Sequence, residues 1–205
     1  MTLFFSIATP LLALYLLFLV WYGGNGKPLR ADEIQAFFDT LDKMNLSESE
    51  KEIIPEIERL VAKDDGKEFV MQNLVRYRLK ALYPAGYSYN DDARAADKRY
   101  GKAIVVPLLR QGSLPIFIAK RSGSFIEPEG ADAWHYVAMV RYRSRRDFLK
   151  FALAIQRQDI AVHKWAALEK THVFPVKPLV CLIMVRSMVA LLLALIGVTL
   201  FLLLR

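Results

Sequence analysis

Long hydrophobic runs occupy both ends of the chain. Between these runs, hydrophobic and polar residues alternate at short intervals. The first run, Leu3 to Tyr22, has 20 residues without a charge. The second, Leu179 to Leu204, has 26 residues with Arg186 as its single charge. A helix rises about 1.5 Å per residue and the hydrocarbon core of a bilayer is about 30 Å thick. We therefore predict that residues 1–26 and 179–205 each hold a membrane-spanning helix, with Pro178 beginning the second.

Residues 27–66 carry the pattern of a helical hairpin. Ala31 to Met44 has one apolar face at helical spacing. Ser47 opens a capping box for a second helix that ends near Asp64, and Pro55 is tolerated only in its first turn. Apolar stripes of this width indicate packing into a core, and the alternative is contact with a membrane surface or a partner. The apolar residues of the first helix are Ile34, Phe37, Phe38, Leu41 and Met44.

From residue 67 onward the pattern changes to strands and helices in the order βαββαβ. The four predicted strands are Phe69–Tyr77, Leu114–Lys120, Trp134–Tyr142 and Thr171–Val176. One helix is capped by Asn90 or Asp91 and ends at Gly112, and another is capped by Ser144. This order predicts an α+β fold, a ferredoxin-like unit over residues 67–178. Its helices cover one sheet face only, so we expect the other face to pair in a homodimer or a higher homo-oligomer.

Several short motifs of this region come in the order found in a known family. They are Asn73-Leu74-Val75-Arg76-Tyr77-Arg78, Tyr100-Gly101-Lys102-Ala103, Pro107-Leu108-Leu109, Val140-Arg141-Tyr142-Arg143-Ser144-Arg145 and His163-Lys164-Trp165-Ala166-Ala167-Leu168-Glu169, followed by Pro175. With these motifs the chain resembles an uncharacterised bacterial family of the dimeric α+β barrel superfamily, over residues 67–178. Where relatives commonly have Tyr-Pro-Ser-Arg, this chain has Arg143 in place of the proline.

The resemblance implies a ligand site between the sheet and its helices. Members of the superfamily include cofactor-free monooxygenases, haem-degrading enzymes and isomerases, and they typically hold a small apolar or aromatic molecule there. Their enzymes often use an Asn, His or Tyr to hold an oxyanion or move a proton. Asn73 and His135 are the candidate catalytic residues on this basis, and the alternative is a structural Asn beside an exposed His. Fold alone selects no reaction.

Aromatic residues supply the candidate ligand contacts. Tyr83 and Tyr87 lie in a loop after the first predicted strand, where they could form a lid over an apolar ligand or sit at the bilayer interface. Tyr100 and Trp134 are the further candidates for ligand binding.

The formal net charge of +7 is concentrated between the two apolar runs. Residues 27–178 hold 26 of the 28 Lys and Arg and all 21 Asp and Glu, a net +5. The positive-inside rule predicts an integral membrane protein with this region cytoplasmic and both termini outside. The resemblance to a bacterial family implies that the membrane is the bacterial inner membrane. Nucleic acid is disfavoured as a partner because no known binding motif accompanies the charge. Candidate contacts to anionic lipid or a partner are Arg76, Arg78, Arg143, Arg145 and Arg186, and solvated charge at a strand edge is the alternative.

The remaining motifs narrow the function classes. The chain has one cysteine, Cys181, and the spacing of His135, His163 and His172 fits no metal motif, so we expect no metal site. No cofactor is expected, although a single histidine could hold haem iron. The sequence thus favours a membrane-anchored protein that binds a small apolar or lipid-derived ligand, with cofactor-independent catalysis left open. The alternative is a non-catalytic subunit of a larger membrane complex, with the small residues Ala190, Ala194 and Gly197 against a partner helix.

Overall fold

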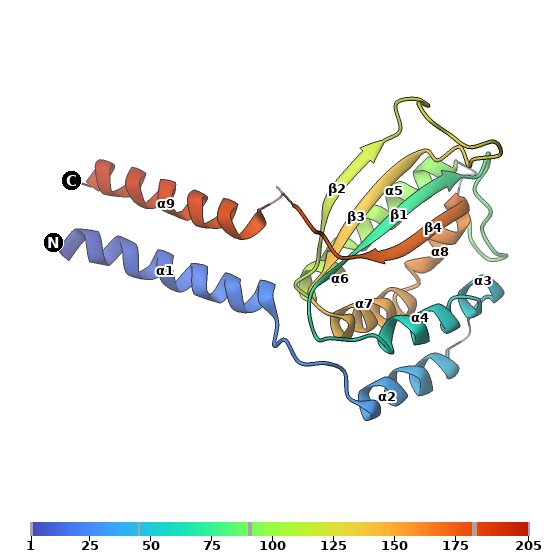
Figure 1. Cartoon of the computed structure of the whole chain (residues 1–205), viewed down its shortest axis with the longest axis horizontal. Coiled ribbons are helices and arrows are strands. Elements are labelled where there is room, and N and C mark those ends of the chain that lie inside the picture. Colours follow the sequence, from blue (N-terminus) through green and yellow to red (C-terminus); the bar gives the residue numbers. More distant parts are fainter. Residues whose placement is uncertain (1, 45, 90–91, 182–183, 205) are drawn as a thin grey trace. The chain divides into compact units, whose positions relative to one another are not determined.

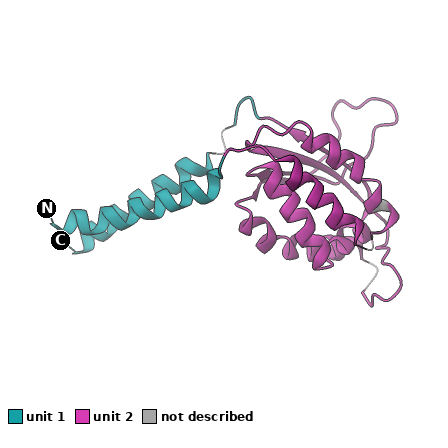
Figure 2. Ribbon diagram, turned by 90° about the horizontal axis from the view of Figure 1, so that it is seen from below, with its two compact units in different colours: residues 1–25, 178–205 teal, residues 26–177 magenta. Residues whose placement is uncertain are grey.

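The computed structural model describes residues 2–44, 46–89, 92–181 and 184–204. The chain divides into two compact units, which Figure 2 colours separately. The helical unit consists of residues 1–25 and 178–205, and the α+β unit consists of residues 26–177. The predicted caps Asn90 and Asp91 lie outside the described residues.

The helical unit pairs α1 (Thr2–Gly23) with α9 (Val185–Leu204). Both helices are long and apolar enough to cross a membrane, by length and composition. They run side by side in opposite directions (Figure 2). Gly197 permits the close approach, since a Cβ atom there would lie only 3.0 Å from Cδ1 of Leu11. The small residues Ala190, Ala194 and Gly197 therefore face a helix of the same chain, together with Ile7, Ala8 and Leu11.

The start of the second apolar helix was predicted wrongly. The sequence placed it at Pro178, but α9 begins at Val185, and residues 177–181 are not helical. A proline disfavours helical backbone in the residue before it, which keeps Lys177 extended after the preceding strand. The later start puts Arg186 in the first turn of α9, where its guanidinium lies 4.7 Å from the ring centre of Tyr22.

The predicted helical hairpin is present, but its second helix is broken. After α2 (Ala31–Asp42) come α3 (Glu48–Lys51) and α4 (Ile54–Val61). Ser47 forms the predicted capping box with Glu50. The break has a physical cause, because Pro55 lacks an N–H and its ring clashes with the carbonyl four residues earlier, at the end of α3. Pro55 therefore lies in the first turn of α4, the position that the sequence required.

The remaining elements follow the βαββαβ order, with each helical connection in two pieces. Two features differ from the prediction. The first helix after β1 is capped by Asp92. It is also divided into α5 and α6, because the ring of Pro107 would clash with the carbonyl of Ala103 in a continuous helix. The elements are β1 (Phe69–Tyr77), α5 (Ala93–Ala103), α6 (Val105–Arg110), β2 (Leu114–Lys120), β3 (Tyr136–Tyr142), α7 (Arg145–Arg157), α8 (Ala161–Ala167) and β4 (Leu168–Val176).

The four strands form one antiparallel sheet in the order β2-β3-β1-β4. β1 and β2 have the predicted bounds, whereas β3 begins two residues later than predicted and β4 three residues earlier. In the centre of the sheet Asn73 pairs with Ala138 on one side and with Val173 on the other. Because side chains alternate along a strand, these three residues lie on the same face.

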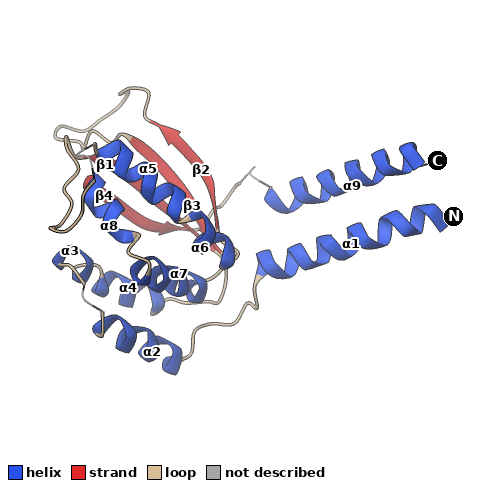
Figure 3. Ribbon diagram, turned by 180° about the vertical axis from the view of Figure 1, so that it is seen from behind, coloured by secondary structure: helices blue, strands red, loops and turns tan. Residues whose placement is uncertain are grey.

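Helices cover that face of the sheet and leave the other open. Figures 1 and 3 view the α+β unit from opposite sides, and α5 and α8 lie behind the strands in one and before them in the other. One core cluster joins Phe69 and Tyr142 of the sheet to Leu108 and Phe151 of the helices. A second joins Phe37 and Leu41 of α2 to Leu149 of α7. The N-terminal hairpin is thus packed as part of the core.

Candidate functional site

A cavity of about 1250 Å³ lies on the covered face of the sheet. Its floor comes from alternate residues of β1 and β3, paired so that Met71 opposes Val140 and Asn73 opposes Ala138. Its walls include Tyr100 and Ile104 of α5 and the apolar side of α7. A mostly apolar cavity with a few polar groups is the usual form of a small-molecule site. Further apolar lining residues are Val75, Phe148, Phe151, Ala152 and Ile155.

Asn73 lies in the middle of the cavity floor. Its Nδ2 donates to the backbone oxygen of Met71 at 3.1 Å and to that of Ala138 at 3.4 Å. No donor to its Oδ1 is found in the described part of the chain, so this oxygen can accept a hydrogen bond from a ligand. The structure therefore places this predicted residue on the cavity, with one hydrogen-bonding atom engaged and one free.

His135 also lines the cavity but lies away from Asn73, near the end of β1. Its Nδ1 accepts a hydrogen bond from the backbone N–H of Tyr77 at 3.0 Å. A neutral ring held in this way carries its proton on Nε2 and can donate from there. Asn73 and Tyr77 are four residues apart on one strand, about 13 Å at 3.3 Å per residue. The two predicted catalytic residues are therefore not brought together as a pair.

Beside His135 the cavity ends in polar side chains that the sequence reasoning missed. The carboxylate of Asp97 accepts hydrogen bonds from the hydroxyl of Tyr77 at 2.8 Å and from that of Tyr136 at 3.2 Å. Lys164 of α8 lines the same cavity, with its Nζ 6.0 Å from the ring centre of Tyr100. We call Tyr77, Asp97, Tyr136 and Lys164 the polar end of the cavity.

Burial shifts the acid–base properties of the polar end. Burial raises the pKa of Asp97, although the two hydroxyls and the charge of Lys164 oppose this shift. Burial lowers the pKa of Lys164, and the charge of Asp97 opposes that shift. Burial also raises the pKa of Tyr77 and of Tyr136, so both phenols stay protonated near neutral pH and remain hydrogen-bond donors. Such shifts in a cavity are typical of functional sites, although ion-pair networks produce them as well.

The predicted tyrosine loop packs on the outside of α5 and α8. The hydroxyl of Tyr83 lies 2.9 Å from Nδ1 of His163, and the guanidinium of Arg99 donates to the same hydroxyl at 3.1 Å. Tyr87 donates to Asp159. Among the described residues that line the cavity, Tyr100 is present, whereas Tyr83, Tyr87 and Trp134 are not. A ligand contact by these three residues stays a prediction. The ring centre of Trp134 lies 6.5 Å from that of His172.

The predicted basic residues of the α+β unit mostly face acids of the same chain. Arg76 forms ion pairs with Glu169 at 2.6 Å and Asp132 at 3.3 Å, and Arg143 pairs with Asp147 at 2.7 Å. These contacts offset much of the charge expected to attract anionic lipid. The other two predicted basic residues of this unit are Arg145 and Arg78. Arg145 contacts Asp64 and Asp65, and Nε of Arg78 is buried without a hydrogen-bond partner in the described structure.

Metal ligands are not grouped in the described structure. Within residues 2–44, 46–89, 92–181 and 184–204, no three His, Cys, Asp or Glu side chains are placed to hold a metal ion.

The comparisons with known proteins establish the fold class. No protein-family model matches the chain, and no curated protein matches it. Solved structures do match, and they show that the chain has a known α+β fold. Two of them are crystal structures of RPA0582 from Rhodopseudomonas palustris, a protein of unknown function, one in methylated form. They are 23% and 22% identical to this chain, with TM-scores of 0.54 and 0.55. Each alignment covers 67% of this chain, and 95% and 98% of the respective neighbour.

Proposed function

We propose that this chain is a membrane-anchored protein whose α+β unit binds a small apolar or lipid-derived molecule in the cavity between sheet and helices. The cavity of about 1250 Å³ is the observation that carries the proposal. Apolar side chains supply most of its surface, and Asn73 offers a free acceptor at its floor. Cofactor-independent catalysis is compatible with this site, because Asn73, His135 and the polar end supply hydrogen bonds and titratable groups.

The proposed fold is the ferredoxin-like unit of a dimeric α+β barrel. The βαββαβ order and the antiparallel strand order β2-β3-β1-β4 support it. The face opposite the helices carries half-buried Leu74, Val137, Met139 and Phe174, and Phe117 with 43% of its surface exposed. We propose that a second copy covers this open face, since large exposed apolar patches are uncommon on monomers.

Two apolar helices and the distribution of charge support the proposed location. Helices α1 and α9 would span the membrane, and the net charge of +5 in residues 27–178 would keep the α+β unit on the cytoplasmic side. A ligand that partitions into the bilayer would then be concentrated near the cavity. The rival role, an accessory subunit of a membrane complex, was favoured by Arg186 together with Ala190, Ala194 and Gly197. In the structure α1 packs against the three small residues, and Arg186 lies over the ring of Tyr22, so contacts within the chain account for these features.

The test compares two phenylalanine substitutions on neighbouring residues of β3. Ala138→Phe fills the cavity, whereas Val137→Phe points to the open face and serves as the control. Full-length protein in detergent is titrated by calorimetry with 2-naphthalenemethanol, a neutral apolar probe, against empty micelles. We expect saturable binding to wild type and to Val137→Phe, and binding at least about tenfold weaker to Ala138→Phe, a loss of about 1.4 kcal/mol.

Mass spectrometry of molecules extracted from the purified protein gives a second measurement. A small molecule carried through purification by wild type should be absent from Ala138→Phe and reduced in Asn73→Ala. If wild type carries no such molecule and shows no saturable binding of the probe, the proposed function is wrong.

A further inference from the structure

The polar end of the cavity has an arrangement that indicates which head group a ligand carries. Its four residues come from four elements, β1, α5, β3 and α8, and all of them line the cavity. Side chains from separate elements meet only in the folded chain, and here they meet beside a mostly apolar space. A ligand whose apolar body fills that space would present one end of itself to these groups.

Asp97 already has partners on both carboxylate oxygens. Tyr77 donates to Oδ2 at 2.8 Å and Tyr136 donates to Oδ1 at 3.2 Å. Each hydroxyl donates its only proton in a hydrogen bond to Asp97, so its oxygen can act toward a ligand only as an acceptor. The buried carboxylate is therefore stabilised from within the chain and does not need a cationic ligand to balance it.

Lys164 lacks a comparable partner. It is half-buried, and no carboxylate lies within ion-pair distance of its ammonium group in the described structure. Its contacts are the rings of Trp165 and Tyr100, with Nζ 5.2 and 6.0 Å from their centres. Cation–π contacts stabilise an ammonium group less than a hydrogen bond to an anion does. The three N–H donors of Lys164 are thus available to a ligand in the cavity.

The charges near the polar end favour an anion. Arg94 places its guanidinium 5.6 Å from the ring centre of Tyr77, and it also lines the cavity. With Lys164 it gives two positive charges beside the one negative charge of Asp97. Arg94 is exposed and its charge is solvated, whereas the charge of half-buried Lys164 is costly until an anion binds to it. Planar arginine pairs that suit phosphate are not part of the polar end, and one ammonium matches the single charge of a carboxylate.

We propose that the polar end recognises a carboxylate, so that the ligand of this cavity is an apolar acid whose head group accepts hydrogen bonds from Lys164. The inference rests on the proposed function and specifies the substrate class of the same site. Asp97, Tyr77 and Tyr136 act as positioning residues, because the charge of Asp97 favours the charged form of Lys164 and the two hydroxyls hold Asp97 in place.

The experiment measures head-group preference on one apolar body. Full-length protein in detergent is titrated by calorimetry with 2-naphthoate and with 2-naphthalenemethanol. We expect wild type to bind the acid about tenfold more tightly than the alcohol, the difference made by one charged hydrogen bond. Lys164→Met keeps the length of the side chain without its charge, and it should bring the acid-to-alcohol ratio close to one.

Two controls separate this inference from its alternatives. Lys102→Met removes an exposed lysine of α5 and should leave the ratio as in wild type. Brief labelling of amines with trinitrobenzenesulfonate, mapped by mass spectrometry, should show Lys164 protected by 2-naphthoate and not by the alcohol.

The possible outcomes are distinct. If wild type binds both probes equally, or if Lys164→Met keeps the preference for the acid, the head-group inference is wrong while ligand binding stands. If neither probe binds and no molecule is carried through purification, the proposed function itself fails. If Lys164→Met binds neither probe while wild type binds both, Lys164→Arg decides. Restored preference for the acid in that variant supports the inference, and binding of the acid and the alcohol with equal affinity overturns it.

Discussion

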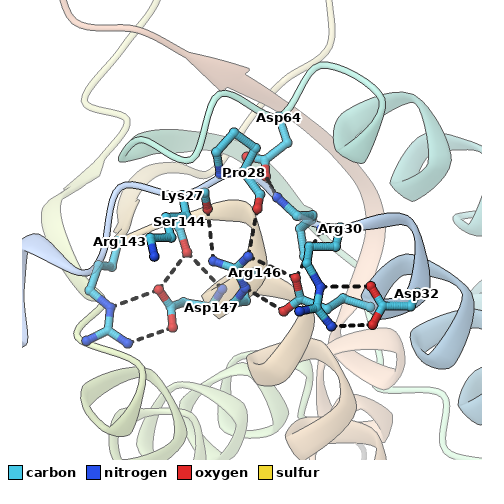
Figure 4. Close-up of polar contacts among 11 residues, drawn as sticks. Lys27, Pro28, Arg30, Asp32, Asp64, Arg143, Ser144, Arg146 and Asp147 are labelled. Atoms are coloured by element: carbon cyan, nitrogen blue, oxygen red, sulfur yellow. Dashed lines mark hydrogen bonds and ion pairs between the residues drawn. The ribbon is translucent and has the colours of Figure 1, made fainter.

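Arg146 of α7 contacts the segment that leads into α2, which lies 113 or more residues earlier in the sequence. Its guanidinium donates to the backbone oxygens of Lys27 and Pro28 (Figure 4), at 2.9 and 2.8 Å. It also donates to the carboxylate of Glu33 at 2.7 and 2.9 Å. The chain enters the α+β unit through Lys27 and Pro28, so this one side chain of α7 fixes the entry to the start of α2. The hydrogen bond from Arg146 is the main cause that lowers the pKa of Glu33 to about 2.

The first residue-scale prediction concerns Glu33→Gln. The carboxylate has a pKa of about 2 in the folded chain and 4.5 otherwise, so its contribution is fully present above pH 4.5 and is lost as the pH falls toward about 2. Because Glu33 is one-third exposed, we expect the substitution to cost only about 1 kcal/mol at pH 7. Thermal unfolding of the full chain, followed by circular dichroism from pH 7 to pH 3, measures the difference.

The matched control is Glu58→Gln, an exposed glutamate of α4. It should unfold like wild type at every pH. A deficit of Glu33→Gln that stays constant from pH 7 to pH 3 would contradict the assignment, because it would be independent of the ionised carboxylate.

At this scale the sequence identified part of the site and missed the rest for a physical reason. Asn73, Tyr100 and His135 line the cavity, and their roles stay predictions. Asp97 and Lys164 were left aside because charged residues on helices are normally solvated. Their spacing held a usable signal, since Asp97 lies four residues after buried Ala93 and Lys164 lies three after buried Ala161. The arginines were overestimated as ligand contacts, because a sequence shows their charges but not the ion pairs that Arg76 and Arg143 form with acids of the same chain.

At the scale of elements, periodicity located the strands well and missed breaks that proline causes. Alternation gave β1 and β2 with their observed bounds. Each predicted helix of the α+β unit that contained a proline, at Pro55 and at Pro107, is divided in the structure, and the break falls within the preceding turn, whereas α1 continues through Pro10. The covered and open faces of the sheet could be expected from the pattern. The cavity could not, because its shape depends on how α5, α7 and α8 pack.

The element-scale prediction concerns the packing of α1 on α9. In Gly197→Leu a side chain would occupy the place of Leu11, whose Cδ1 is already 3.0 Å from an ideal Cβ. Membrane helices associate through such close contacts, so we expect the two helices to separate locally. The yield of a short thiol cross-linker between cysteines at Ala8 and Ala194, in a Cys181→Ser background, should fall several-fold.

The compensating variant makes this prediction specific. Leu11→Ala combined with Gly197→Leu exchanges large and small residues across the contact and should restore most of the cross-linking. Unchanged cross-linking in Gly197→Leu alone would mean that the helices do not depend on this contact.

For the whole molecule, the open face of the sheet is the surface on which we propose that a second copy packs. One face of the sheet is covered by α5, α7 and α8, and the other carries Phe117, Met139 and Phe174 without any element of the same unit over them (Figures 1 and 3). Each Å² of apolar surface that a second copy buried on the open face would stabilise the assembly by about 25 cal/mol. The proposed dimer would also explain why Gln72 is the one polar residue at the centre of the described open face, since an amide can hydrogen-bond across an interface.

The whole-molecule prediction compares two phenylalanines. Phe117→Asp puts a carboxylate into the proposed interface, and burial of an unpaired charge should weaken association by about 100-fold or more. Phe125, in the loop after β2, is 97% exposed and lies outside the sheet, so Phe125→Asp is the control of equal chemistry. Light scattering of the chromatographed full chain, with the detergent mass subtracted, should give a dimer for wild type and Phe125→Asp and a monomer for Phe117→Asp. A monomeric wild type, or dissociation caused equally by both substitutions, would leave the open face without its proposed partner. Because the cavity lies on the opposite face, a monomeric Phe117→Asp that still binds 2-naphthalenemethanol would separate assembly from ligand binding.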